Sequence, residues 1–169
     1  MDLDGTLIDT DILKPFRDAR KWQECYRNVA KTTIYPGLNK FLSLIQSHSF
    51  AFGIVTMSPR PYAERLLNYH RIKYSGLVCY HDCKRRKPYP DPMILCAKQM
   101  KVSPDRIIAI GDEPSDIIAA KSAGMVPIGV TWGKGQADIF SAAGTRYVCQ
   151  TGEELTNLLL HVIKNRCSG

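Results

Sequence analysis

Two aspartates near the start of the chain are spaced for chemistry. Residues 2–7 read Asp-Leu-Asp-Gly-Thr-Leu, and alternation along an extended segment would put Asp2 and Asp4 on the same side. Gly5 would let the backbone turn away sharply behind them. Two close carboxylates must share a proton or bind a cation, because like charges raise one pKa. The pair could therefore supply an ionised nucleophile beside a protonated acid.

Three further polar positions follow apolar runs. Thr56 comes directly after residues 50–55, and a hydroxyl there could hold a phosphoryl oxygen. Lys87 lies beyond residues 76–80, where an ammonium would balance carboxylates and an incoming phosphate. Asp112 and Asp116, in the sequence Gly-Asp-Glu-Pro-Ser-Asp, supply the oxygen ligands that Mg²⁺ prefers. These positions favour magnesium-assisted phosphate chemistry.

The elements that must position these side chains alternate along the chain. Apolar runs of strand length cover residues 50–55, 76–80, 106–110, 126–130 and 146–148. Helical patterns cover residues 37–48, 59–69, 90–101, 115–123, 136–143 and 152–164. Alternating strands and helices predict an α/β fold with a doubly wound, Rossmann-like parallel sheet, formed as a single domain over residues 1–169. In such sheets, ligands bind at the carboxyl ends of the strands.

One segment breaks this alternation. Residues 11–35 contain a helix-like, Arg- and Lys-rich stretch and no apolar run of strand length, so we expect a small helical cap over the site. At the element boundaries, Ser58 followed by Pro59 predicts a helix N-cap, and Gly124 predicts a helix end.

Composition narrows the class of protein. The chain has 169 residues and a formal net charge of +7, which favours anionic ligands but leaves nucleic acid, small phosphates and acidic surfaces open. No apolar run is long enough for a membrane span. The acidic N-terminus makes a secretory signal unlikely, and the six scattered cysteines are interpreted as free thiols. We therefore expect a cytoplasmic protein, while the oligomeric state stays open.

Taken together, the motifs resemble those of the haloacid dehalogenase-like hydrolase superfamily. The DxDGT sequence, a threonine after a strand, a lysine followed by proline, and GDxxxD occur in the order that this superfamily uses, from Asp2 to about Gly133. The sequences Tyr-Pro-Gly-Leu at 35–38 and Lys-Pro-Tyr-Pro-Asp-Pro at 87–92 resemble the phosphoglycolate-phosphatase-like branch.

The resemblance implies a role for each residue. Asp2 would attack phosphorus and form an aspartyl-phosphate, and Asp4 would protonate the leaving group and then activate water. Thr56 would grip the phosphoryl group, while Lys87 would orient and balance Asp2. The implied cofactor is Mg²⁺, and the implied substrate is a small phosphorylated metabolite such as phosphoglycolate or a sugar phosphate. The metal ligands would be Asp2, Asp4 (through its backbone carbonyl), Asp112 and Asp116.

The sequence departs from the family pattern in two places. Members carry a hydrophobic strand before the first aspartate, but only Met1 precedes Asp2 here. We therefore expect the first strand to be missing, so that either Met1 is an internal residue of a longer protein or the nucleophile lies on a loose end. The cap of about 25 residues is also short, so the site is expected to admit larger substrates or to need a partner for closure.

Two other functions stay open at this point. The basic residues of 14–31 and 84–87 would suit a phosphatase acting on nucleotides or nucleic-acid ends. A non-catalytic phosphate-binding or interaction protein is the second alternative. A zinc site at Cys79 and Cys83 is disfavoured, because no second ligand pair of the usual spacing follows.

Overall fold

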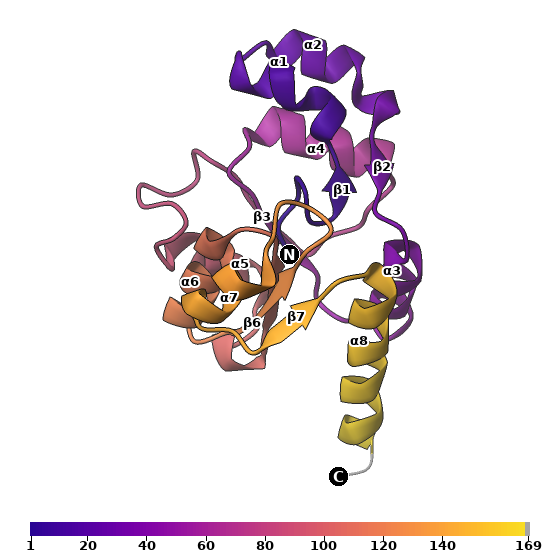
Figure 1. Ribbon diagram of the computed structural model, residues 1–169, viewed down its shortest axis with the longest axis vertical. Coiled ribbons are helices and arrows are strands. Elements are labelled where there is room, and N and C mark those ends of the chain that lie inside the picture. The colour runs from indigo at the N-terminus through magenta and orange to yellow at the C-terminus, as the bar shows by residue number, and fades with distance from the viewer. Residues whose placement is uncertain (168–169) are drawn as a thin grey trace.

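Two groups of parallel strands form the centre of the molecule. The computed structural model describes residues 1–167, with side chains described through residue 164 (Figure 1). Strand β3 (Gly53–Val55) pairs with β4 (Gly76–Val78), with Ile54 opposite Leu77. A second sheet has the order β5 (Ile108–Gly111), β6 (Val126–Val130) and β7 (Tyr147–Cys149).

The first two residues join the two sheets. The backbone N–H of Val55 donates to the carbonyl of Met1 at 3.0 Å, and that of Asp2 donates to the carbonyl of Ile110 at 2.9 Å. The Met1 ammonium donates to the Gly53 carbonyl at 2.8 Å. Met1 and Asp2 thus occupy the place of a strand between β3 and β5, and the N-terminus lies at the centre of the fold (Figure 1). The expectation of a loose end was wrong, because both sheets hold this segment.

An apolar cavity lies next to Met1, in the space between β3 and β5. It has a volume of about 440 Å³ and runs between β3 and β5, with Met1, Phe52, Met100 and Ile108 among its lining residues. The two strands therefore do not pair directly with each other.

Helices cover both faces of the sheets. On one face α3 (Leu38–Ser47) packs against α8 (Gly152–Cys167), and on the other lie α5 (Asp91–Met100) and α6 (Pro114–Ser122). Because side chains alternate along a strand, Ile54 joins the core beneath α3 and α8, whereas Val55 joins the core with α5 and α6. This confirms the doubly wound α/β class.

The predicted elements correspond closely to the observed ones. Each of the five apolar runs overlaps a strand, and each of the six helical patterns overlaps a helix, including α4 (Arg60–Tyr69) and α7 (Ala137–Ala143). Gly124 follows α6 with a φ of +78°, as its prediction as a helix end requires.

Residues 8–35 form a separate layer above the sheets. Strand β1 (Ile8–Asp9) pairs antiparallel with β2 (Thr33–Ile34), a pairing that the sequence did not predict because each strand is only two residues long. Between these strands lie the short helices η1 (Asp11–Leu13), α1 (Lys14–Asp18), α2 (Trp22–Arg27) and η2 (Val29–Lys31). This layer packs on α4, where the rings of Trp22 and Tyr62 lie 5.9 Å apart (Figure 1).

The structure also bears on the cysteines and on membrane-spanning helices. The five cysteines whose side chains are described are all free thiols, and Cys167 lies outside that group. Among residues 1–167, no helix combines the length and the apolar character that a membrane crossing requires.

Candidate active site

Asp2 and Lys87 form the centre of the site. The ammonium of Lys87 donates to Asp2 Oδ1 at 2.8 Å, to Asp116 Oδ1 at 2.5 Å and to the Val55 carbonyl at 3.2 Å. The Lys87 side chain is only 3% exposed. The loop after β4 therefore delivers a buried cation to the nucleophile predicted from the sequence.

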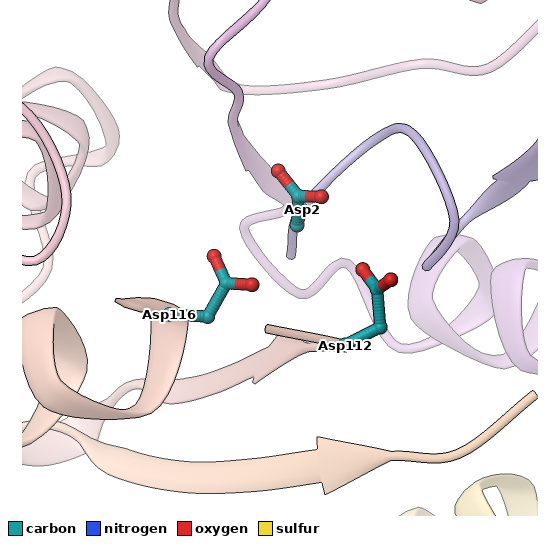
Figure 2. Close-up of side chains that lie close together, drawn as sticks. All are labelled: Asp2, Asp112 and Asp116. Carbon is teal, nitrogen blue, oxygen red and sulfur yellow. The ribbon is translucent and has the colours of Figure 1, made fainter. Parts of the chain in front are cut away.

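Three of the four predicted metal-binding residues bring their carboxylates together here. Asp2 follows the Met1 bridge, Asp112 directly follows β5, and Asp116 lies in the first turn of α6; one oxygen atom from each lies within 4.8 Å of the others. Figure 2 shows the three side chains close together, each extending from a different segment of the chain. Asp112 is held by the Thr6 hydroxyl at 2.5 Å and by the Lys134 backbone N–H at 3.2 Å. This set of hard oxygen donors fits Mg²⁺.

Burial raises the pKa values of the three clustered carboxyl groups. It raises the pKa of Asp2 to about 7, with Lys87 opposing the shift and Asp116 adding to it. Burial also raises the pKa of Asp112 and that of Asp116. Burial works to lower the pKa of Lys87, but Asp116 and Asp2 outweigh it and raise that pKa. The Lys87 ammonium pairs with two of the three carboxylates and not with Asp112, so an added cation would be stabilised there.

Asp4 lies in the same cleft but has a different set of partners. Its Oδ1 accepts hydrogen bonds from Thr10 Oγ1 and Tyr62 OH, each at 2.8 Å, and its Oδ2 accepts one from Ser58 Oγ at 2.7 Å. Arg17 of α1 completes the set with an ion pair. The Asp4 carboxylate thus lies apart from the three clustered carboxylates, which leaves its backbone carbonyl as the expected metal contact.

The prediction of Ser58 as a helix N-cap was wrong. Helix α4 begins at Arg60 with Pro59 in the N-cap position, so Ser58 lies one residue too early to cap it. Its hydroxyl makes no cap hydrogen bond to α4 and donates to Asp4 Oδ2 at 2.7 Å. The sequence also gave no signal for Arg17 or Tyr62 as partners of Asp4.

Thr56 lies at the wall of the cleft. Its backbone N–H donates to the Val78 carbonyl at 2.9 Å, and its Oγ1 accepts from the Ser58 N–H at 3.0 Å. The hydroxyl hydrogen can therefore be donated to a ligand. Asp2, Asp4, Thr56 and Lys87 all line one cleft of about 250 Å³.

Two glycines allow the backbone to approach Asp112. Gly5 has a φ of +80°, which confirms the predicted turn, and a Cβ there would lie 2.6 Å from Asp112 Oδ2. A Cβ at Gly133 would lie 2.1 Å from the Gly5 carbonyl oxygen. The loops that carry these glycines meet directly over Asp112 and leave no room for a side chain.

Residues 13–130 match the family model described as haloacid dehalogenase-like hydrolase. The chain belongs to this family. Among curated haloacid dehalogenase-like relatives, the phosphoglycolate phosphatase of Escherichia coli (strain K12) is 34% identical over 112 residues, which cover 64% of this chain and 44% of that protein. The phosphoglycolate phosphatase of Salmonella typhi is 29% identical over 141 residues, or 79% of this chain and 56% of that protein. The expected resemblance to phosphoglycolate phosphatases is confirmed, although the chain spans only about half the length of these relatives.

Solved structures of haloacid dehalogenase-like proteins share the fold. A hydrolase from Pseudomonas syringae has a TM-score of 0.80 at 20% identity and covers 95% of this chain and 96% of its own. The β-phosphoglucomutase from Clostridium difficile has a TM-score of 0.67 at 25% identity and covers 79% of this chain and 57% of its own.

Proposed function

We propose that the chain is a phosphomonoester hydrolase that depends on Mg²⁺ and acts through an aspartyl-phosphate on Asp2. The observation that carries this proposal is the environment of Asp2, which lines the cleft, is held by Lys87 at 2.8 Å, and lies in a cluster with Asp112 and Asp116. A carboxylate fixed in this way is suited to attack, because its orientation is set before the substrate arrives.

The proposed reaction has two steps. In the first, an oxygen of Asp2 bonds to phosphorus while the ester P–O bond breaks, and Asp4 gives a proton to the departing oxygen. In the second, Asp4 takes a proton from water, the water oxygen bonds to phosphorus, and the bond from phosphorus to Asp2 breaks. Thr56 would donate its hydroxyl hydrogen to a phosphoryl oxygen in both steps, and Lys87 would keep Asp2 in place.

The carboxylates of Asp2, Asp112 and Asp116 and the backbone carbonyl of Asp4 would hold Mg²⁺. When bound, the ion would neutralise charge on the phosphoryl oxygens. The fit rests on three close carboxylates, of which Lys87 pairs with Asp2 and Asp116.

The proposed substrate is a small phosphorylated metabolite. The cleft of about 250 Å³ matches a small ester, and the relatives named above are phosphoglycolate phosphatases and a β-phosphoglucomutase. We propose that residues 11–35 serve as a reduced cap on the single domain, since Asp11, Lys14 and Arg17 all line the cleft. The free thiols support a cytoplasmic location.

The nucleic-acid alternative gains little support from the basic loop after β4. Arg86 lies over the ring of Tyr80 at 3.8 Å and donates to the Tyr80 carbonyl, and Arg85 pairs with Asp91 at 3.0 Å. Both guanidinium groups are thus held by groups of the loop itself or of the first residue of α5.

Phosphate release tests the proposal. We expect release from 4-nitrophenyl phosphate and from 2-phosphoglycolate in Mg²⁺, and none in EDTA. Asp2→Asn should abolish release, whereas Asp138→Asn, an exposed residue of α7, should leave it unchanged. Activity of Asp2→Asn equal to that of the unchanged protein would rule out this nucleophile. Binding of phosphate without any release would instead favour the non-catalytic alternative.

A further inference from the structure

Arg17 reaches from the upper layer into the cleft. It belongs to the short helix α1, and its guanidinium forms an ion pair with the Asp4 carboxylate. The side chains of Arg17 and Asp4 are only 15% and 14% exposed. The pair therefore forms away from bulk water, where a charge–charge contact has more effect than on an open surface.

The contact with Asp4 places Arg17 on the leaving-group side of the cleft. This step rests on the proposed function, in which Asp4 gives its proton to the ester oxygen. A group that does so must lie within hydrogen-bond reach of that oxygen. Whatever touches the Asp4 carboxylate is consequently next to the part of the substrate that departs.

The Arg17 guanidinium can release Asp4 and bind another anion, because other side chains still donate hydrogen bonds to the Asp4 carboxylate. Asp4 also accepts hydrogen bonds from Thr10, Ser58 and Tyr62 at 2.7–2.8 Å. Arg17, by contrast, forms its ion pair with Asp4, as far as the described residues show. Its guanidinium also lies 6.0 Å from the centre of the Tyr62 ring. The guanidinium is thus the group with capacity for another anion, and its planar fork matches a carboxylate.

The other cations that line the cleft form ion pairs with carboxylates other than Asp4. Lys87 is held between Asp2 and Asp116. Lys14 is 43% exposed and pairs with Asp18 at 2.5 Å, and Lys134 faces Glu113 at 3.8 Å. Arg17 is therefore the cation best placed to bind a negatively charged group on the leaving portion of the substrate.

We propose that Arg17 is a specificity-determining residue that binds an anionic group on the leaving portion of the substrate. The preferred substrates are then small phosphate esters that carry a carboxylate a few atoms from the ester oxygen. The cleft volume of about 250 Å³ limits their size.

Three esters of nearly equal size and different charge test this role. They are 2-phosphoglycolate with a carboxylate, 2-hydroxyethyl phosphate with a neutral hydroxyl, and phosphoethanolamine with an ammonium. We expect kcat/KM to be highest for 2-phosphoglycolate. Arg17→Gln should lower that value by about 10- to 100-fold, the usual effect of losing a charged hydrogen-bond partner, and should change the neutral ester much less. Arg17→Glu should shift the preference toward phosphoethanolamine.

Lys21→Gln is the matched control, because Lys21 is an exposed cation in the same layer, between α1 and α2. It should leave the order of the three esters unchanged. An equal loss for all three esters in Arg17→Gln would indicate a merely structural role and overturn the proposal, as would an unchanged preference in Arg17→Glu.

Calorimetric binding of the same esters separates this proposal from the proposed hydrolysis. The protein could release no phosphate from any ester. In that case, recognition by Arg17 would still be supported if Arg17→Gln bound 2-phosphoglycolate more weakly than the unchanged protein and bound the other two esters equally well. Equal affinities of both proteins for 2-phosphoglycolate would overturn it.

Discussion

The ammonium of Lys87 lies 2.8 Å from the carboxylate of Asp2, although 85 residues separate the two in the chain. The same ammonium reaches Asp116, 29 residues further on, at 2.5 Å. Each of these groups comes from a different segment, and all three are buried. The arrangement exists only when the sheets are assembled, so the integrity of the site and the stability of the fold depend on the same contacts.

Replacing the cation should therefore destabilise the whole protein. In Lys87→Met, Asp2 and Asp116 lose their buried counter-charge, and we expect the free energy of unfolding to fall by about 3–5 kcal/mol. Urea unfolding monitored by circular dichroism measures this change.

Lys98→Met is the control for Lys87→Met, because Lys98 is an exposed lysine in α5. It should change the unfolding free energy by less than about 0.5 kcal/mol. Adding Asp116→Asn to Lys87→Met should restore part of the lost stability. A double variant as unstable as the sum of its parts would contradict the pairing.

The elevated pKa of Asp2 predicts a pH-dependent stability in the absence of metal. Its pKa is about 7 in the folded protein against an ordinary value of 3.8, so the folded state binds this proton more tightly than the unfolded state. The contribution of Asp2 to the unfolding free energy must then fall as the pH rises between these two values. Asparagine resembles the protonated acid and should remove this dependence.

We therefore expect Asp2→Asn to match the unchanged protein at pH 4 and to exceed it at pH 8, by on the order of 1 kcal/mol or more. Urea unfolding in EDTA at the two pH values provides the test. The comparison between the two proteins cancels the titration of groups that do not interact with Asp2. A stability difference that is the same at both pH values would show that Asp2 ionises normally.

Magnesium should raise the melting temperature through the three clustered carboxylates. A ligand at about 100 times its Kd stabilises the folded state by about 2.7 kcal/mol, which corresponds to roughly 5–10 °C for a chain of this size. Asp112→Asn should lose most of this increase. Sodium chloride at matched ionic strength separates binding from screening, and an equal increase with that salt would argue against a specific site.

Gly133→Ala should disturb the site by steric overlap. Its Cβ would lie 2.1 Å from the Gly5 carbonyl oxygen and 2.6 Å from Asp112 Oδ2, and one of the contacting atoms is backbone that cannot move freely. We expect a loss of about 1–3 kcal/mol in unfolding free energy and a weaker thermal response to Mg²⁺.

Gly124→Ala is a useful comparison for this prediction. Gly124 has a φ of +78° but open space around its Cα, so alanine adds backbone strain of about 1 kcal/mol without any clash. Its response to Mg²⁺ should stay intact. If both variants respond equally to the ion, the close approach of Gly133 has no effect on the site.

The sequence predicted the elements well because their signals are local. Strands β5 and β6 are covered by helices on both faces of a parallel sheet, so residues 107–110 and most of 126–130 are apolar and the pattern is strong. The antiparallel pair of β1 and β2 has two residues in each strand, too few for any periodicity. The bridging role of Met1 depends on contacts with Gly53 and Val55, which no local pattern contains.

The convergence of Asp2, Lys87, Asp112 and Asp116 followed from their positions after strands of one fold class. The surroundings of Asp4 could not be predicted in the same way. Ser58 and Tyr62 lie 54 and 58 residues from Asp4, and Ser58 also fits the ordinary pattern of a helix cap. Arg17 lies in a segment whose course above the cleft is set by packing on α4.

The position of the Met1 amino group has a practical consequence for affinity tags. Burial lowers the pKa of this amine, which donates to the Gly53 carbonyl at the mouth of an apolar cavity. Any residue joined in front of Met1 would turn the charged amine into a neutral amide and would enter the space beside Phe52 and Ile108. A hydrophilic purification tag fused there would have to pass between β3 and β5, whereas an apolar leader of a few residues would fit that space.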